Sequence, residues 1–356
     1  MAIRSTPEIP VRPSEPSEFH VGSRLRPIHY WSAFGAACVA IQVYVYGSWL
    51  LSGDVYPQRT GSDPVPLGVQ AAAWIMQATS ILAVVALIVY VWRRSRREHA
   101  LAWDALIAIG FAAAYWQDPI INYFRPVYFY NSYLINVGAW TSHIPGWLSP
   151  HAGNLPEPLF MILPIFTCLF VVFGIAFCAM ARRVRRIWPD IGQVGLFVIG
   201  VLVFGIFNIF MEAVFLQTRL FVYAGVVNPL SLFAGHSYQF PLYEAVVAGI
   251  NSSVVGMVRL TRDRNGQSAI ERGADELSAG KRAKTLARVL AFVGLGNAVL
   301  VFTNVVYIAF GLHVDQMPQY PSYLKNDICG TEISPPCPGP GVPISLDNKP
   351  HRAGPR

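Results

Sequence analysis

Long apolar segments alternate with shorter polar ones along most of this chain. A helix needs about 20 apolar residues to cross the hydrocarbon core of a bilayer, and most of the segments reach or approach that length. The pattern predicts an all-α fold, a polytopic bundle of about seven transmembrane helices. The predicted spans are residues 30–51, 69–92, 101–116, 155–181, 194–215, 241–258 and 286–312.

The polar segments divide the chain into three parts. Residues 1–29 are rich in Pro, Glu and Arg and lack the apolar core of a signal peptide, so we expect a disordered cytoplasmic tail. Residues 30–312 form the predicted transmembrane domain, with outer aromatic loops at 117–154 and 216–240. Residues 313–356 are rich in Pro and Gly and form the expected extracytoplasmic tail.

Composition also indicates a membrane protein. The chain is 53% hydrophobic and 13% charged, whereas a soluble domain carries about 25% charged residues. We therefore expect an integral membrane protein, in a bacterial plasma membrane, with membrane lipid as a partner. The net charge of +7 does not indicate a nucleic-acid partner, because the basic residues cluster in short runs beside apolar segments.

The distribution of Lys and Arg predicts the orientation of the bundle. If the N-terminus is inside, 20 of the 27 Lys and Arg residues fall in the inner segments or at the inner end of the last span. Basic residues are enriched in cytoplasmic loops, so seven spans place the N-terminus inside and the C-terminus outside. The charged segment 259–284 is then an inner loop, and its alternating charges predict a partly helical, solvated surface.

The stretch from Trp116 to Trp147 is too polar to continue its apolar neighbours and too aromatic for a plain loop. Pro119, Pro126 and Pro145 prevent a long helix there. One interpretation is an interfacial aromatic belt. The density of Asn and charge favours a surface that holds and orients an apolar ligand. The substrate-binding candidates in this stretch are Trp116, Asn122, Tyr123, Arg125, Tyr130, Asn131, Tyr133, Asn136, Trp140 and His143.

Four carboxyl groups lie at or inside the predicted spans, all near the outer boundary. An ionisable group inside a span is costly and is a functional candidate by default. Asp118, Glu212 and Glu244 are the catalytic candidates. The alternative for each is a structural hydrogen bond or an ion pair with Arg125 or Arg219. Glu157 stands between two prolines and is expected to cap a helix.

Asparagines on the later spans are expected to face the same interior as these carboxyl groups. Asn208 stands four residues before Glu212 and therefore shares its helix face. Asn251 stands seven residues after Glu244, and Asn304 lies on the last span. We expect Asn208, Asn251 and Asn304 to contribute to substrate binding.

Glu212 has the most apolar sequence neighbourhood of the four carboxyl groups. We therefore expect burial to raise its pKa most strongly. A carboxyl group that stays protonated near neutral pH can work as a general acid. The hypothesis is that Glu212 is the general acid and that Asp118 or Glu244 is its partner.

Motifs for cofactors and metals are missing from the sequence. It has no Walker loop, no GxGxxG and no GxSxG, and its histidines form no metal-binding pattern. We therefore expect neither a metal ion nor a cofactor. Cys329 and Cys337 lie in the outer tail, where the compartment permits a disulfide bond between them.

Several long and unusual motifs resemble one known family. The central stretch contains QDP at 117–119, YNSYLINVGAW at 130–140 and PGW at 145–147. Later motifs are IERGADEL at 270–277, DICG at 327–330 and CPGPGVP at 337–343. Together they resemble the AveC family of membrane spirocyclases, over most of the chain from Tyr30 to Pro343.

The resemblance implies a cofactor-independent enzyme of polyketide metabolism that closes a lipophilic hydroxy-ketone into a spiroketal. The founding member of the family acts in avermectin biosynthesis and can also dehydrate the spiroketal ring. The alternative from another class is a membrane protein that binds or carries a lipid or polyketide without changing it. The resemblance assigns no catalytic residue here, so the candidates above rest on the sequence alone.

The charge distribution gives a test of the seven-span topology. Reporter fusions after Arg97, Arg186 and Lys284 should read as cytoplasmic, because these residues close the basic inner segments. Fusions near Gly61 and Pro340 should read as outside. A cytoplasmic signal from the fusion near Pro340 would overturn the predicted topology.

Overall fold

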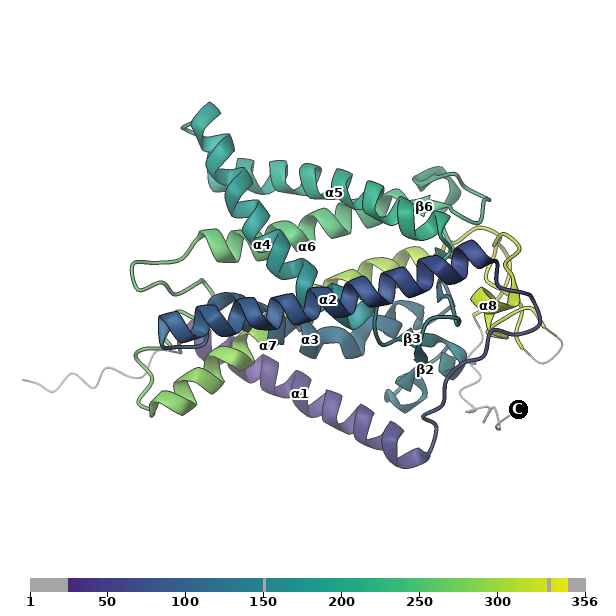
Figure 1. Ribbon diagram of the computed structural model, residues 1–356, viewed down its shortest axis with the longest axis horizontal. Coiled ribbons are helices and arrows are strands. Elements are labelled where there is room, and N and C mark those ends of the chain that lie inside the picture. The colour runs from purple at the N-terminus through teal and green to yellow at the C-terminus, as the bar shows by residue number, and fades with distance from the viewer. Residues whose placement is uncertain (1–24, 150–151, 332–333, 345–356) are drawn as a thin grey trace, which may run out of the picture.

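The computed structural model describes residues 25–149, 152–331 and 334–344. The fold is mostly helical, as predicted, and most of its helices run roughly along the long axis of the molecule (Figure 1). The α-helices are α1 (Pro27–Ser52), α2 (Leu67–Glu98), α3 (Trp103–Ala114), α4 (Ile162–Ile187), α5 (Gln193–Gln217), α6 (Leu242–Leu260), α7 (Lys281–Gly311) and α8 (Ser322–Lys325).

Five helices in the described part of the chain are long and apolar enough to cross a membrane. These are α1, α2, α4, α5 and α7. The third predicted span instead divides into α3 and a 3₁₀ helix, η1 (Tyr115–Asn122). Pro119 explains the change, because proline lacks an N–H and disfavours helical geometry at the residue before it. The complete seven-span topology stays a prediction.

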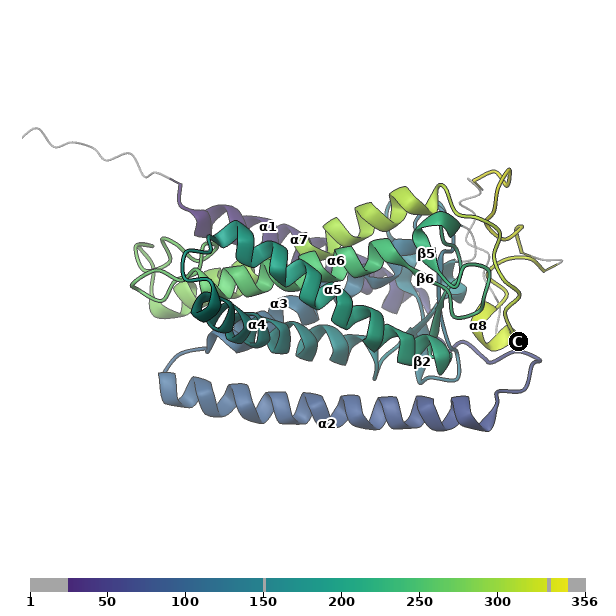
Figure 2. The same cartoon turned by 90° about the horizontal axis from the view of Figure 1, so that it is seen from above.

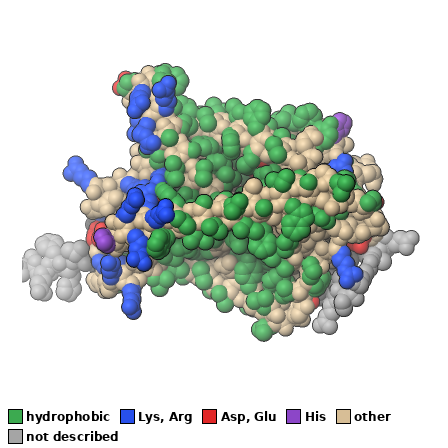
Figure 3. Space-filling model, viewed as in Figure 1, with side chains coloured by type: hydrophobic (Ala, Val, Ile, Leu, Met, Phe, Trp, Pro, Cys, Tyr) green, Lys and Arg blue, Asp and Glu red, His purple; other side chains and the backbone are tan. Residues whose placement is uncertain are grey.

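The surface separates charge from apolar side chains along the bundle axis. Lys and Arg gather at one end of the helices, and apolar side chains cover the middle (Figure 3). Leu82 on α2 and Phe210 on α5 are 67% and 72% exposed. Large apolar side chains facing outward over the length of long helices are expected of a surface in contact with lipid. The fold is therefore that of a membrane protein.

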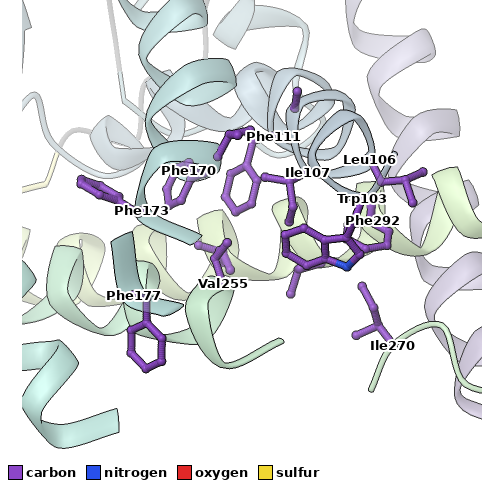
Figure 4. Close-up of a cluster of buried hydrophobic side chains, with 14 of the residues drawn as sticks. Trp103, Leu106, Ile107, Phe111, Phe170, Phe173, Phe177, Val255, Ile270 and Phe292 are labelled. Carbon is purple, nitrogen blue, oxygen red and sulfur yellow. The ribbon is translucent and has the colours of Figure 1, made fainter. Parts of the chain in front are cut away.

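Close backbone contacts hold α3 and α1 against α7. A Cβ added to Gly110 would lie 2.3 Å from the carbonyl oxygen of Phe292, so only glycine permits this approach of α3 to α7. Gly35 makes a similar approach from α1. Phe111 stacks on Phe170 of α4 at 3.7 Å between ring centroids, in the apolar cluster drawn in Figure 4. Figure 2 shows that α2 lies along one side of the bundle.

Short strands gather at the end of the bundle opposite the basic residues, and we call this the strand end (Figure 1). They form three antiparallel two-stranded sheets, β1–β4, β2–β3 and β5–β6. Short 3₁₀ helices link them: η2 (Trp140–His143), η3 (Ala152–Asn154) and η4 (Asn228–Leu230). The strands are β1 (Tyr128–Tyr130), β2 (Asn136–Gly138), β3 (Pro156–Pro158), β4 (Phe221–Tyr223), β5 (Ser231–Leu232) and β6 (Phe240–Pro241).

The β1–β4 sheet has two different faces, because successive side chains in a strand alternate. Tyr130 and Tyr223 belong to the apolar cluster on the helix side. Phe129 and Val222 belong to another cluster, which includes Tyr323 of the C-terminal segment. The Pro/Gly-rich segment therefore packs against the back of this sheet over its described residues, and it contains the disulfide bond between Cys329 and Cys337. Residues 345–356 of the predicted tail lie outside the described residues.

The charged segment 259–284 was expected to be partly helical and solvated. Its two ends belong to α6 and α7, and many of its residues are exposed, but its middle is not helical and is partly buried. Residues 262–280 contain turns and bends without a helix in the described structure. Glu271 is fully buried, where it accepts hydrogen bonds from Ser268 and forms an ion pair with Arg288 at 2.7 Å. Side-chain bonds to the backbone, such as Gln267 Oε1 to the N–H of Gly273, compete with a helix here.

The N-terminal tail was expected to end at residue 29, but α1 already begins at Pro27. Proline is favoured at the first position of a helix, because its missing N–H would have no partner there. Residues 1–24 of the predicted tail lie outside the described residues.

A buried ion cluster joins three helices at the basic end of the bundle. Asp104 of α3 is fully buried. It accepts hydrogen bonds from Arg94 at 2.6 Å and from Tyr90 at 2.7 Å on α2, and it pairs with Arg259 on α6. Removing one partner of a buried ion pair leaves uncompensated charge, which costs about 3–5 kcal/mol.

We therefore predict that Asp104→Asn destabilises the protein by about 3–5 kcal/mol. The measurement is the thermal midpoint of the detergent-solubilised protein. It is determined from the amount of monodisperse folded protein that remains after heating. Asp190→Asn is the matched control, because Asp190 is exposed. Equal midpoints for the Asp104 and Asp190 variants would contradict a stabilising role for the cluster.

Candidate active site

A cavity of about 180 Å³ lies between α4, α5, α6, α7 and the β1–β4 sheet. Its α4 wall is apolar and includes Phe166, Phe170 and Phe173. Polar groups converge from the other walls, as in ligand sites where a few polar groups orient a mostly apolar ligand. The polar lining residues are Asp118, Tyr128, Tyr130, Asn208, Glu212, Tyr223, Glu244, Asn251, Ser252, Thr303, Asn304 and Tyr307.

Glu212 of α5 and Glu244 of α6 form a carboxyl pair on one wall of the cavity. The amide of Asn208 donates to Glu212 Oε1 at 3.2 Å and to Glu244 Oε1 at 3.5 Å, so it bridges the two groups. The hydroxyl of Tyr223 donates to Glu212 Oε2, and that of Tyr307 donates to Glu244 Oε2 at 2.5 Å. Four elements, α5, α6, α7 and β4, therefore converge on this pair.

Local sequence explains how this pair is assembled. Asn208 and Glu212 lie one helical turn apart on α5, so both point toward α6. Glu244 lies in the first turn of α6, three residues after the N-cap residue Pro241, where the helix dipole favours a carboxylate. A single helix–helix contact therefore brings two acidic side chains from distant parts of the sequence together.

Asp118 of η1 and Glu157 of β3 form a second carboxyl pair. Tyr130 donates to Asp118 Oδ2 at 2.7 Å, and Tyr115 donates to Glu157 Oε2 at 3.5 Å. The two carboxyl groups also hydrogen-bond to each other. Burial raises the pKa of Asp118 to about 7. Burial, followed by the charge of Asp118, raises the pKa of Glu157 well above its usual range.

Glu157 was expected to cap a helix, and this prediction is wrong. Glu157 lies in β3 opposite Val137 of β2, and the residue that precedes α4 is Met161. A residue before proline is biased toward extended geometry, and Pro158 follows Glu157. The proline therefore favours a strand, which turns the side chain into the protein beside Asp118.

Tyr128 of β1 lies within electrostatic reach of three of these carboxyl groups. Its pKa is raised well above the usual range, first by burial and then by the charges of Glu212, Asp118 and Glu244. Its ring lies 4.8 Å from that of Tyr130 and 5.3 Å from that of Tyr223. The β1–β4 sheet thus places a row of phenol groups between the two carboxyl pairs.

The arginines proposed as alternative partners for the carboxyl groups are engaged elsewhere. Arg125 donates to the backbone oxygen of Val342 at 2.7 Å, and Arg219 donates to the hydroxyl of Tyr323 at 3.1 Å. The hydrogen bonds of both carboxyl pairs come from phenol, amide and carboxyl groups. Ion pairs in the described part of the chain do not involve these four acids.

The structure brings only part of the predicted site together. The predicted residues that line the cavity are Asp118, Tyr130, Asn208, Glu212, Glu244, Asn251 and Asn304. Asn251 also donates to Thr303 at 2.8 Å, and Asn304 donates to the backbone oxygen of Gln117 at 3.2 Å. These two amides therefore fix neighbouring elements as well as facing the cavity.

The other predicted binding residues form contacts within the loops at the strand end. Asn122 Oδ1, for example, accepts the N–H groups of Val127 and Tyr128 at 2.8 and 3.0 Å. Buried loop backbone has no ladder partners of its own, so side chains must satisfy it. The residues used in this way are Asn122, Tyr123, Arg125, Asn131, Asn136 and Trp140. The remaining three bond to side chains instead: Trp116 to Asn297, Tyr133 to Gln70 and His143 to Asp54.

Sequence reasoning missed Glu157 and three of the phenol groups, those of Tyr128, Tyr223 and Tyr307. A signal existed for Tyr307, which lies one turn after Asn304 on α7. Tyr128 and Tyr130 alternate around Phe129, which is the period of a strand, but three residues are too few to identify one. No group of three His, Cys, Asp or Glu side chains suited to a metal ion occurs among the described residues.

Comparison with known proteins gives one result. The family model described as spirocyclase, AveC-like, matches residues 92–324 of this chain. No curated protein and no solved structure matches it. The matched range contains all four carboxyl groups and all the phenol groups of the cavity, whereas Cys329 and Cys337 lie beyond it.

Proposed function

Because the chain belongs to the AveC-like spirocyclase family, we propose that it is a cofactor-independent membrane cyclase that forms a spiroketal from a lipophilic hydroxy-ketone. The observation that supports this proposal is the apolar cavity whose acids are bonded only to phenol, amide and carboxyl groups. Two neighbouring carboxyl groups without a cation do not both ionise readily, so such a pair retains a proton that it can donate.

The reaction begins when one hydroxyl of the substrate adds to its ketone and gives a hemiketal. The first step that needs the acid is departure of water from this hemiketal. Glu212 then donates a proton to the hemiketal hydroxyl, the carbon–oxygen bond breaks, and water leaves with the bonding electrons. The product is an oxocarbenium ion. The carboxylate left on Glu212 and the faces of Tyr128 and Tyr223 stabilise its positive charge.

The second step is ring closure. The remaining hydroxyl of the substrate attacks the oxocarbenium carbon, and a carbon–oxygen bond forms. Asp118, which also lines the cavity, takes the proton from that hydroxyl. The sum of hemiketal formation and these two steps is one dihydroxy-ketone converted into one spiroketal and one water, and proton exchange returns Glu212 and Asp118 to their starting states. An acid and a base lining the same cavity would serve a dehydration in the same way.

The walls of the cavity favour a lipophilic substrate. The α4 wall supplies Phe166, Phe170 and Phe173, and α5 supplies Phe215. Burial of apolar substrate surface against these side chains contributes about 25 cal/mol per Å². Asn208, Asn251 and Asn304 provide polar contacts that orient the hydroxyl groups. Holding both hydroxyls near the ketone removes much of the entropic cost of ring closure.

We predict that Glu212→Gln lowers turnover by about 10²–10⁴-fold, which is the usual contribution of a general acid. Glutamine keeps the shape and the hydrogen-bond acceptor that Tyr223 uses, but it cannot deliver the proton. The measurement is conversion of a lipophilic dihydroxy-ketone by the protein in lipid nanodiscs, with substrate affinity determined in parallel. Affinity should change little, because the acid acts mainly in the transition state.

Glu276→Gln is the matched control for this experiment, because the Glu276 side chain is 59% exposed and pairs with Arg26. It should convert the substrate at the wild-type rate. The assignment of Glu212 fails if its Gln variant also keeps the wild-type rate. It fails equally if yield and affinity fall together, since that result indicates a structural role. Binding without turnover in the wild-type protein would favour a carrier.

A further inference from the structure

Glu157 lies behind the cavity and not on its wall. It is 1% exposed, whereas its partner Asp118 is half-buried and lines the cavity. A substrate in the cavity can therefore contact Asp118 directly, whereas Glu157 can act on the substrate only through Asp118. Burying a second carboxyl group at such a place is costly, and no ion pair offsets the cost in the part of the chain that the structure describes.

The backbone holds Glu157 in one position. Val137 faces Glu157 across the β2–β3 sheet, and Asn136 and Gly138 pair with the prolines on either side. The N–H of Leu159 donates to the oxygen of Ile135 at 3.0 Å, which continues the pairing. The two prolines restrict φ in this strand. The backbone of Glu157 therefore cannot move away from Asp118 without disrupting β2 and β3, and its buried side chain is held on the inner side of the strand.

The titratable groups that face this pair come from several elements of the described structure, and they are phenols. They are Tyr46 of α1, Tyr115 of η1, and Tyr128 and Tyr130 of β1. Phenols donate hydrogen bonds but carry no positive charge near neutral pH. Two carboxyl groups in these surroundings share one proton, because two adjacent anions would repel each other at low dielectric.

The position of that proton follows from the surroundings of each group. Asp118 accepts a hydrogen bond from Tyr130 at 2.7 Å, which favours its anion. Glu157 has the weaker phenol contact, with Tyr115 at 3.5 Å, and it is the more deeply buried of the two. The proton therefore resides on Glu157, and the hydrogen bond from Glu157 to Asp118 further favours the anion on Asp118.

We propose that Glu157 is a positioning residue, which holds a proton in its hydrogen bond to Asp118 and so keeps Asp118 as the anionic base facing the cavity. The inference rests on the proposed function, since the base acts in ring closure. It assigns Glu157 no contact with substrate. It also gives the two carboxyl pairs different tasks, because the pair of Glu212 and Glu244 donates a proton and the pair of Asp118 and Glu157 accepts one.

The proposal predicts a particular pH dependence. The base must be deprotonated, so activity should fall as pH falls through the pKa of Asp118, which burial raises to about 7. Glu157→Gln retains a hydrogen-bond donor on a side chain of the same length. The acidic limb of the pH–activity profile, where activity falls with the protonation of Asp118, should therefore stay at the same pH. Glu157→Met removes the donor, so the pKa of Asp118 and with it the acidic limb of the profile should move up by about one pH unit. Turnover at pH 7 should then fall by about fivefold, because the deprotonated fraction of Asp118 falls from about a half to about a tenth.

The experiment compares these two variants with wild type and Asp118→Asn in nanodiscs. A second readout follows ionisation of Asp118 by infrared difference titration of protein labelled with carbon-13 aspartate, with Asp118→Asn identifying the band. This readout does not require turnover, so it separates failure of the proposed function from failure of this inference. The Asp118 band should titrate at a higher pH in Glu157→Met than in wild type and Glu157→Gln.

Two results would overturn the proposal. One is an unshifted Asp118 titration in Glu157→Met. The other is a loss of turnover in Glu157→Gln as large as that in Asp118→Asn, because it would mean that Glu157 itself transfers a proton. If Glu157→Met does not fold, Glu157→Leu replaces it with the same expected shift. The titration of Asp118 near pH 7 in wild type and in Glu157→Gln tests the proposal even without an apolar variant.

Discussion

Burial of acidic groups without basic partners is the constraint on which the account of this protein depends. At the basic end of the bundle, buried carboxylates are neutralised conventionally: Asp104 pairs with Arg94 and Arg259, and Glu271 pairs with Arg288. At the strand end, the acids of the two carboxyl pairs are bonded to phenols, amides and each other. A buried charge is costly unless it is paired, so these acids must share or hold protons. The partners that this protein provides at the strand end are donors suited to stabilising partly protonated carboxyl groups: Tyr130, Asn208, Tyr223 and Tyr307.

The β1–β4 sheet makes this arrangement possible. Each of its strands is only three residues long. The face toward the helices nevertheless carries the phenols, and the other face packs against the C-terminal segment. The hydroxyl of Tyr320 in that segment donates to the backbone oxygen of Tyr223 at 3.3 Å. Cys329, bonded to Cys337, is fully buried in the same cluster. The C-terminal segment therefore supports the wall that positions the tyrosines, although it lies mostly beyond the range matched by the family model.

Sequence alone predicted the helical architecture and part of the site. The spacing of Asn208 and Glu212 placed them on one face of a helix, and the Lys and Arg distribution put the acids at a common level. The sequence did not reveal the position of Glu157 beside Asp118, because an acid between two prolines gives no indication of which strand its segment will pair with. The polar and aromatic residues of 116–147 were mostly assigned to ligand binding, whereas the irregular backbone there requires many of them for its own hydrogen bonds, as Asn122 and Asn136 show. Tertiary pairing of short segments supplied what local patterns do not contain.

The central claim is that the acids of this cavity convert a bound hydroxy-ketone and do not merely hold it. The most direct measurement uses a synthetic dihydroxy-ketone that carries oxygen-18 in its ketone, incubated with the protein in lipid nanodiscs and, separately, with heat-inactivated protein. The account predicts that the active protein forms the spiroketal faster than the heat-inactivated control does. One configuration at the spiro carbon should be in excess, and the oxygen-18 label should be released as water. Recovery of labelled ketone bound to the protein, with spiroketal forming no faster than in the control, would contradict it.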